Sequence, residues 1–167
     1  MIAQMLVLFV VPALLALAAG WDLASFTIPN FLSLILIAAF VLFAGAAHMP
    51  LAAAGLHGLA GAAGLAVSFT LFALGYVGGG DAKLFAAIAL WFGFGSVVDF
   101  TLVAALFGGG LALALLSLRS LPLPAALSGQ GWINRLHDEK SGIPYGVALS
   151  AGALVILPHT DVFRLAF

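Results

Sequence analysis

The stretch Gly78-Gly79-Gly80-Asp81-Ala82-Lys83-Leu84 leads a run of glycines into one acid and one base, within sequence that is otherwise apolar and uncharged. An ionisable side chain is costly to hold at a membrane boundary, so Asp81 is a candidate functional residue. Glycines lack a Cβ and let another backbone approach closely, as docking a peptide beside a carboxylate requires. A helix that begins near Asp81 would favour the ionised acid through its dipole.

Composition assigns the sequence around this stretch to the membrane. Hydrophobic residues make up 65% of the 167 residues and charged residues only 7%, against about 25% charged in an ordinary soluble domain. A membrane-spanning helix needs about 20 apolar residues, which leaves room for about six such helices and little else. We therefore predict an all-α, polytopic membrane protein with about six transmembrane helices and a single membrane-embedded domain over residues 1–167.

The charge and cysteine counts exclude several classes of function. A formal net charge of −1 and the lack of a Lys/Arg cluster argue against nucleic-acid binding. The chain has no cysteine, which excludes disulfides, thiol catalysis and thiolate-bound zinc or iron–sulfur clusters. We expect no metal and no cofactor, and chemistry that depends on carboxylates, histidines or hydroxyls.

Three apolar runs precede the glycine stretch and predict three helices, over residues 2–20, 31–47 and about 51–76. The first run has no Lys or Arg ahead of it, which argues against a cleaved signal peptide. Residues 21–30 contain a Trp, an acid, two hydroxyls and a proline, and we interpret them as a short loop. Pro29 then helps to begin the next helix.

Two stripes of small residues predict close helix packing in lipid. On the third predicted helix the stripe is Ala54, Gly58, Ala62 and Ala66, and on the fifth it is Ala104, Gly108 and Ala112. His57 lies beside the first stripe. We interpret this histidine as structural, with a site role as the alternative.

Toward the C-terminus, residues 84–98 and 100–118 predict two helices separated by Asp99, and residues 143–158 predict a last helix. Residues 119–142 form the one sizeable polar segment and are expected to be a cytoplasmic loop. Within it we predict a turn at Ser128-Gly129-Gln130-Gly131. A short interfacial helix is expected around Trp132 to Leu136.

Charge asymmetry orients these helices. With six spans, the loops near Asp22 and Asp81 and the loop 119–142 fall on one side of the membrane. Four of the five Lys/Arg residues lie on that side, and Arg164 lies opposite; the four are Lys83, Arg119, Arg135 and Lys140. The positive-inside rule therefore makes this side cytoplasmic.

The same topology places Asp22, at the end of the first helix, level with Asp81, at the start of the fourth. Two carboxylates that share a site repel each other, so one is ionised and the other protonated near neutral pH. The ionised acid takes a proton from a water that attacks a peptide carbonyl, and the other donates toward the oxyanion. Asp99 is a rival partner, but the topology puts it at the opposite face. Lys83 either approaches the two acids and reduces the difference between their pKa values, or extends its side chain to the lipid surface.

Three segments carry a resemblance to a known family. Gly78–Leu84 resembles the G-x-G-D-x-K-L motif of type IV prepilin peptidases, and Asp22 followed by Ile28-Pro29-Asn30 resembles their first-aspartate segment. Ile143-Pro144-Tyr145-Gly146-Val147-Ala148 is similar to the segment that opens their last helix. Within the family, the chain most resembles the small peptidases of tight-adherence (Flp-type) pilus systems. Full-size members add a methyltransferase region with paired C-x-x-C motifs, so amino-methylation is not expected here.

The resemblance implies an aspartic endopeptidase of the inner membrane that removes the basic leader of a prepilin after a glycine, at the cytoplasmic face. Asp22 and Asp81 carry over as the catalytic pair. The motif or substrate-binding positions that carry over are Gly78, Gly79, Gly80, Lys83, Pro29 and Asn30. Family members often have basic residues where this chain has Leu23-Ala24-Ser25-Phe26-Thr27, so contacts of those bases do not transfer.

Other functions remain open at this point. An archaeal-type preflagellin peptidase shares the motif. A cation-coupled transporter would use acids and broken helices near the bilayer midplane, usually in repeated halves, and the sequence shows no convincing repeat. A non-enzymatic assembly protein would explain the small-residue stripes but needs no paired acids. A presenilin-like enzyme would need a proline-alanine-leucine motif, whereas this chain has Pro124-Ala125-Ala126-Leu127.

Overall fold

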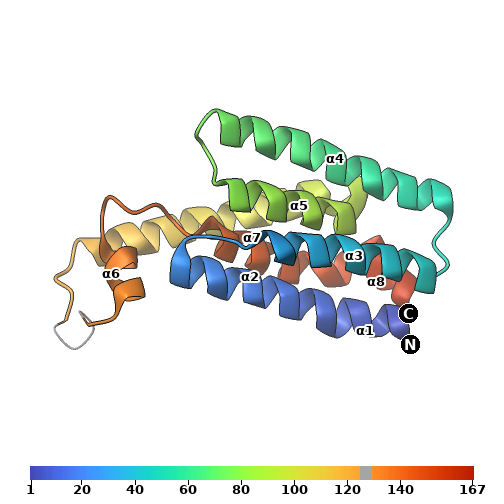
Figure 1. Cartoon of the computed structure of the whole chain (residues 1–167), viewed down its shortest axis with the longest axis horizontal. Helices are drawn as coiled ribbons and strands as arrows, with labels where there is room; N and C mark the ends of the chain where they lie inside the picture. The colour runs from blue at the N-terminus through green and yellow to red at the C-terminus, as the bar shows by residue number, and fades with distance from the viewer. Residues whose placement is uncertain (125–128) are drawn as a thin grey trace.

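The computed structural model describes residues 1–124 and 129–167, so Ser128 of the predicted turn lies outside the described residues. The described part consists of helices and their connections, without a strand (Figure 1). In chain order the elements are α1 (Ile2–Met5), the π-helical η1 (Leu6–Val10), α2 (Val11–Ser25), α3 (Asn30–Ala46), α4 (Leu51–Ala73), α5 (Gly79–Arg119), α6 (Gly131–His137), α7 (Tyr145–Ile156), the 3-10 helix η2 (Leu157–His159) and α8 (Asp161–Ala166).

Helix α5 consists of two segments that reverse direction at Gly93, as the green and yellow ribbons of Figure 1 show. Gly93 has φ 60° and ψ −176°, a non-helical conformation that glycine tolerates. The rings of Phe85 and Phe100 lie 5.5 Å apart, whereas a straight helix would separate these residues by about 22 Å. We call residues 79–92 the first segment of α5 and residues 94–119 the second segment.

The predicted break at Asp99 is therefore wrong. Asp99 is an exposed residue inside the second segment, where its carboxylate does not interrupt the backbone hydrogen bonds of the helix. A reversal needs a backbone conformation that few residues adopt, and Gly93 supplies it. The helix boundary is thus marked by Gly93 and not by Asp99, the acid that follows it in the apolar run.

The predicted loop 21–30 is also shorter than expected. Helix α2 continues to Ser25 and ends where Phe26 adopts the left-handed conformation, with φ 56°. The N–H of Phe26 then donates to the carbonyl of Asp22. Asp22 consequently lies on the last turn of a helix, whose backbone holds it in place.

Three helices are long and apolar enough to cross a membrane, and they cover Ile2–Ser25, Leu51–Ala73 and Gly79–Arg119. Shorter apolar helices cover Asn30–Ala46 and Tyr145–His159. Since α5 runs in both directions, the described residues form six apolar passes along the bundle, with both termini at one end (Figure 1). The chain is an all-α, polytopic membrane protein, as predicted.

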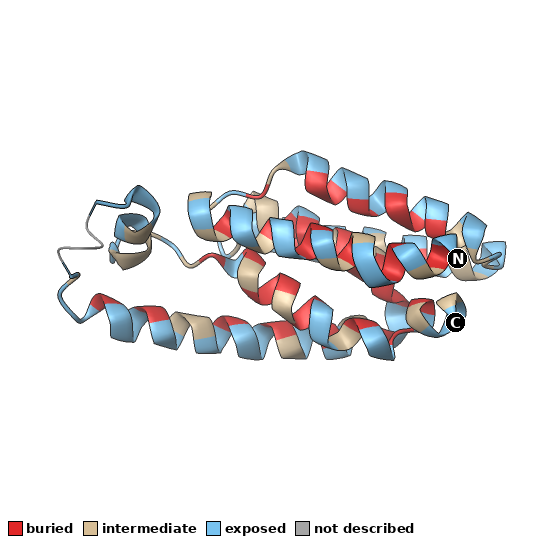
Figure 2. Ribbon diagram, turned by 90° about the horizontal axis from the view of Figure 1, so that it is seen from below, coloured by how far each residue is buried: buried red, intermediate tan, exposed pale blue. Residues whose placement is uncertain are grey.

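Burial follows the same arrangement. The helices bury one face against each other and leave their outer faces exposed (Figure 2). The outer faces carry many large apolar side chains, such as Leu34, Val41 and Leu59. A membrane protein presents such a surface to lipid tails, so these exposed side chains need no further partner.

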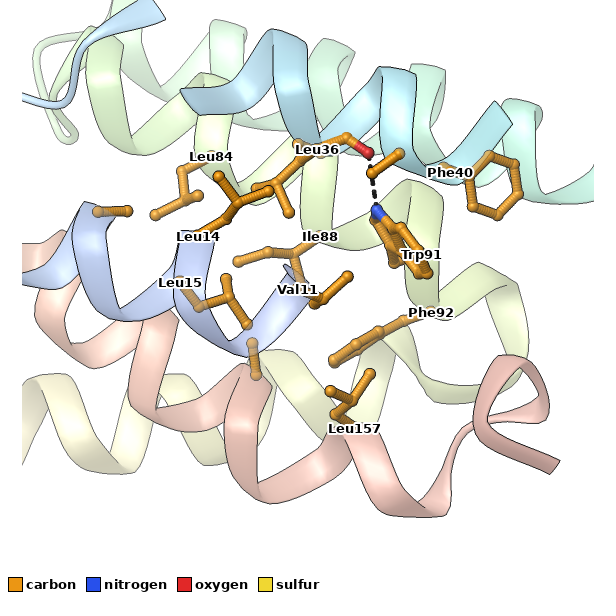
Figure 3. Close-up of a cluster of buried hydrophobic side chains, with 14 of the residues drawn as sticks. Val11, Leu14, Leu15, Leu36, Phe40, Leu84, Ile88, Trp91, Phe92 and Leu157 are labelled. Carbon is orange, nitrogen blue, oxygen red and sulfur yellow. Dashed lines mark hydrogen bonds between the residues drawn. The ribbon is translucent and has the colours of Figure 1, made fainter. Parts of the chain in front are cut away.

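The interior is a cluster of apolar side chains from α2, α3, α5 and η2 (Figure 3). Trp91 is fully buried there, and its Nε1–H donates to the carbonyl oxygen of Leu36 at 2.9 Å. A buried indole N–H needs an acceptor. This bond therefore ties the first segment of α5 to α3.

The predicted packing stripe on α4 is wrong. A Cβ at Gly58 would meet no described atom within 4 Å, and Ala62 and Ala66 are exposed. The packed face instead carries Gly61 and Gly64, where a Cβ would lie 3.0 Å from Leu90 Cβ and 2.9 Å from Ala89 Cβ, respectively. Small residues occur on several faces of α4, and only its neighbour α5 decides which face packs.

The other predicted stripe, on the second segment of α5, does pack against a neighbouring helix, which is α7. A Cβ at Gly152 would lie 2.9 Å from the backbone of Ala104, and one at Gly108 would lie 2.6 Å from the ring of Tyr145. These close approaches let α7 lie directly on α5.

His57 contributes to the reversal of α5. Its Nδ1 lies 2.8 Å from the carbonyl oxygen of Leu90, three residues before the reversal at Gly93. The imidazole also covers Gly93, whose Cβ would lie 3.0 Å from His57 Cε1. Polar groups within an apolar bundle need hydrogen-bond partners, so this contact gives His57 a structural role.

Candidate active site

Asp22 is held by the start of α7. Its side chain is buried, and Oδ2 accepts a hydrogen bond of 2.7 Å from the backbone N–H of Gly146. Gly146 lies in the first turn of α7, where backbone N–H groups have no acceptor within the helix. The positive end of the helix dipole also favours a carboxylate at this position.

Asp81 is held by the start of α5. It lies in the first turn, and the backbone N–H of Gly78, the residue that caps the helix, bonds its carboxylate. A Cβ at Gly78 would lie 2.9 Å from Asp81 Oδ2. Gly78 thus leaves the room that this acid occupies, and the acid satisfies an N–H of the helix start.

The end of α2, which carries Asp22, and the start of α5, which carries Asp81, lie at the same end of the bundle (Figure 1). The negative charge of Asp22 acts on Asp81 across the site. One carboxylate accepts from the start of α7 and the other from the start of α5. Two carboxylates arranged in this way can divide a general acid–base reaction between them.

Ile28 fills the space between the two helix starts. A Cβ at Gly80 would lie 3.1 Å from Ile28 Cβ and 3.2 Å from its backbone nitrogen, and one at Gly146 would lie 2.6 Å from Ile28 Cδ1. The close backbone approach expected at Gly80 is therefore that of the connection between α2 and α3. Gly146 was not among the predicted site residues, although residues 143–148 carry part of the resemblance.

The remaining motif residues pack around this centre. Lys83 Nζ donates to Asn30 Oδ1 at 2.8 Å, so its ammonium joins the start of α3 rather than either acid. Pro29 caps α3. Gly79 lies against the ring of Phe72: a Cβ at Gly79 would lie 3.2 Å from Cε2 of that ring.

A cavity of about 200 Å³ opens beside Asp81. It lies among α4, both segments of α5 and α7. Its lining is largely apolar, and the residues are Val67, Ser68, Leu71, Val77, Asp81, Ala82, Phe85, Thr101, Ala104, Ala105, Tyr145 and Leu149.

Two arginines hold α6 and the residues that follow it near the acids. Arg119 is buried, and it donates from Nε to the carbonyl of Leu136 at 2.8 Å and from Nη2 to that of Gly142 at 2.9 Å. Arg135 on α6 donates to the carbonyl of Ala24 at 3.1 Å, in the same helical turn as Asp22. From the sequence these arginines indicated only the orientation of the chain, because their acceptors are backbone carbonyls, which no residue type marks.

The rival acid is placed elsewhere. Asp99 lies on the second segment of α5, where its side chain is exposed, and it is not among the residues that line the cavity beside Asp81. Among residues 1–124 and 129–167, no three His, Asp or Glu side chains come together as a metal-binding group.

Comparison with known proteins gives one match. The sequence model of the type IV leader peptidase family matches residues 9–113. This range includes Asp22, residues 28–30 and the whole stretch 78–84, and it ends before α7. No curated protein and no solved structure matches the chain.

Proposed function

Since the chain belongs to the type IV leader peptidase family, we propose that it is an aspartic endopeptidase that removes the leader peptide of Flp-type prepilins. In this proposal Asp22 and Asp81 are the catalytic pair. The observation that carries it is the placement of these two acids, far apart in sequence, at two helix starts on one end of the bundle.

The proposed reaction needs only a water and the two carboxylates. The ionised acid accepts a proton from the water as its oxygen attacks the peptide carbonyl carbon. The protonated acid donates its proton to the carbonyl oxygen, which gives a neutral tetrahedral intermediate. When the C–N bond breaks, the leaving nitrogen takes up the proton that the first acid accepted from the water, and a hydroxyl of the intermediate returns a proton to the second acid as the carbonyl re-forms. The N–H groups of Gly146 and Gly78 support this chemistry by fixing where the two carboxylates stand.

We assign the site to the cytoplasmic face of the inner membrane. The support is the distribution of basic residues: the start of α5, with Lys83, the end of α5, with Arg119, and α6, with Arg135, all lie toward the end of the bundle that carries the acids (Figure 1). The basic leader would be cut there after a glycine, while the apolar helix of the prepilin stays in the bilayer.

Cleavage of defined precursors tests this function. The purified protein, reconstituted in lipid, is incubated with a Flp-type prepilin and, separately, with an archaeal preflagellin, and the products are weighed by mass spectrometry. We expect the prepilin to be cut after its glycine. Preference for the preflagellin would reassign the substrate, and a folded, inserted protein that cuts neither precursor would refute the peptidase proposal.

A further inference from the structure

We propose that Arg119 is a positioning residue for the reaction, because it fixes the start of α7, whose Gly146 N–H holds Asp22. The inference rests on the proposed function, since an effect on rate requires that Asp22 acts at the cleaved bond. It adds a residue that lies outside the sequence around either acid and bonds neither of them.

Arg119 joins two backbone carbonyls. It is the last residue of α5 and only 9% exposed. Its Nε donates to the carbonyl oxygen of Leu136 at 2.8 Å, and its Nη2 donates to that of Gly142 at 2.9 Å. A guanidinium presents its donors in a rigid, planar fork. The two acceptors are therefore held in one position relative to each other and to the end of α5.

The burial of this charge needs a reason. A buried guanidinium is costly unless its charge and its N–H groups find partners, and within the described part of the chain no carboxylate forms an ion pair with Arg119. Its partner Leu136 lies in the last turn of α6, where carbonyls lack a donor within the helix. The N–H of Lys140, which could have reached back to that carbonyl, donates to Asp138 Oδ1 instead. Arg119 thus satisfies a carbonyl and fixes the chain that follows α6, which an apolar side chain could not do.

The chain from Gly142 to Gly146 is short and stiff. Pro144 is fully buried, with φ −72°, and its ring fixes its own backbone and restricts that of Ile143. A displacement of Gly142 is therefore passed on to the first turn of α7. There the N–H of Gly146 donates to Asp22 Oδ2 at 2.7 Å.

A second arginine fixes the other side of the same contact. Arg135 of α6 donates to the carbonyl of Ala24, on the helical turn that carries Asp22. The short helix α6 is thus bonded to the end of α2 and, through Arg119, to the end of α5. Arg135 is exposed and makes one such bond, whereas Arg119 is buried and makes two. We therefore assign the positioning role to Arg119.

A double-mutant cycle tests the inference. The values of kcat and KM for a Flp-type prepilin are measured in the full chain for the wild type, Arg119→Gln, Gly146→Ala and the double variant. Arg119→Gln should lower kcat by about 10–100-fold and leave KM within about threefold. In the Gly146→Ala background the same change should cost about threefold or less, because the contact through which Arg119 acts is already disturbed.

Two further variants separate geometry from charge. Arg119→Lys keeps the positive charge, but a compact ammonium cannot reproduce the fork, so it should restore only part of the lost kcat. Arg164→Gln is the matched control, since it removes an exposed arginine that bonds Asp161 on α8; it should keep the wild-type kcat. A kcat of Arg119→Gln equal to that of this control overturns the inference, as does an undiminished loss in the Gly146→Ala background.

A variant with Arg119 intact decides the matter if Arg119→Gln is poorly folded. One glycine inserted after Gly142 loosens the link, so it should lower kcat and speed amide hydrogen exchange at Gly146 by about tenfold or more. Unchanged kcat and unchanged exchange in this variant overturn the inference. Exchange needs no substrate: a wild-type chain that cuts no prepilin refutes the proposed function, while exchange at Gly146 still shows whether the link holds the start of α7.

Discussion

Asp22 and Asp81 are held by backbone groups rather than by charged side chains. Gly146 donates to Asp22 and Gly78 to Asp81, and the nearby Lys83 bonds Asn30 instead. Backbone donors fix the position of a carboxylate without supplying a full positive charge. Each acid therefore remains able to exchange a proton.

Replacing either acid by its amide tests the pair. Asp22→Asn and Asp81→Asn keep size and can still accept the backbone N–H, but neither amide can carry the proton. We expect each to lower kcat/KM by about 10³-fold or more, with the double variant little worse, because the two acids act as a unit. Product mass over time measures the loss. Asp99→Asn and Glu139→Gln should keep most activity, and a normal Asp22→Asn variant would show that Asp81 has another partner.

Gly146→Ala tests the fit between α7 and Asp22. The added Cβ would lie 2.6 Å from Ile28 Cδ1 and 2.9 Å from Asp22 Oδ2, so the carboxylate must move. A displacement of this kind costs on the order of 100-fold in kcat/KM. The matched control is Gly142→Ala, whose Cβ would meet no described atom within 4 Å. Equal activity of the two variants would contradict the close fit.

Gly80→Val tests the approach of Ile28 to α5. The space at Gly80 is taken by the Cβ and backbone nitrogen of Ile28, at 3.1 and 3.2 Å, and valine adds two further methyl groups. We expect cleavage to be abolished while the protein still inserts and folds, as judged by gel filtration in detergent. Full activity would remove the physical reason for this glycine.

At the level of elements, α5 carries the most unusual feature of the chain. Its reversal depends on the backbone freedom of Gly93 and on His57, whose Nδ1 contacts the carbonyl oxygen of Leu90. The reversal brings the second segment back beside Asp81 and so completes the cavity wall.

Gly93→Ala should destabilise the fold. Alanine would be strained at φ 60° and would press on the ring of His57, which costs about 1–3 kcal/mol. Thermal unfolding in detergent measures the change. Gly110→Ala is the control, because Gly110 is helical with open space at its Cβ; it should be neutral or slightly stabilising. Equal stability of the two variants would show that the reversal is not strained.

For the whole molecule, orientation is the property to test, and the lack of cysteine makes labelling free of background. Single cysteines at the exposed positions Thr27, Tyr76 and Glu139 should react from the cytoplasm, and one at Leu51 from outside. The reason is the charge asymmetry between the two ends. If the cysteines at positions 27 and 76 react from opposite faces, Asp22 and Asp81 lie on opposite sides of the membrane and cannot form a catalytic pair.

Some of this architecture was predictable because it depends on local properties. Hydropathy and span length identify the membrane class and the order of the apolar passes, and the count of passes puts Asp22 and Asp81 at one end. Hydropathy does not mark where a helix reverses, which is why Asp99 was mistaken for the break at Gly93.

The sequence by itself determined the six apolar passes, their order and the end at which both acids lie. Each of these follows from the hydropathy and length of single segments, without knowledge of which segments contact each other. Only the tertiary structure decided which face of α4 packs, that the N–H of Gly146 holds Asp22, and that a cavity forms beside Asp81. Each of these depends on which atoms of distant segments meet. Backbone donors and small residues carry no side-chain signal that names their partners.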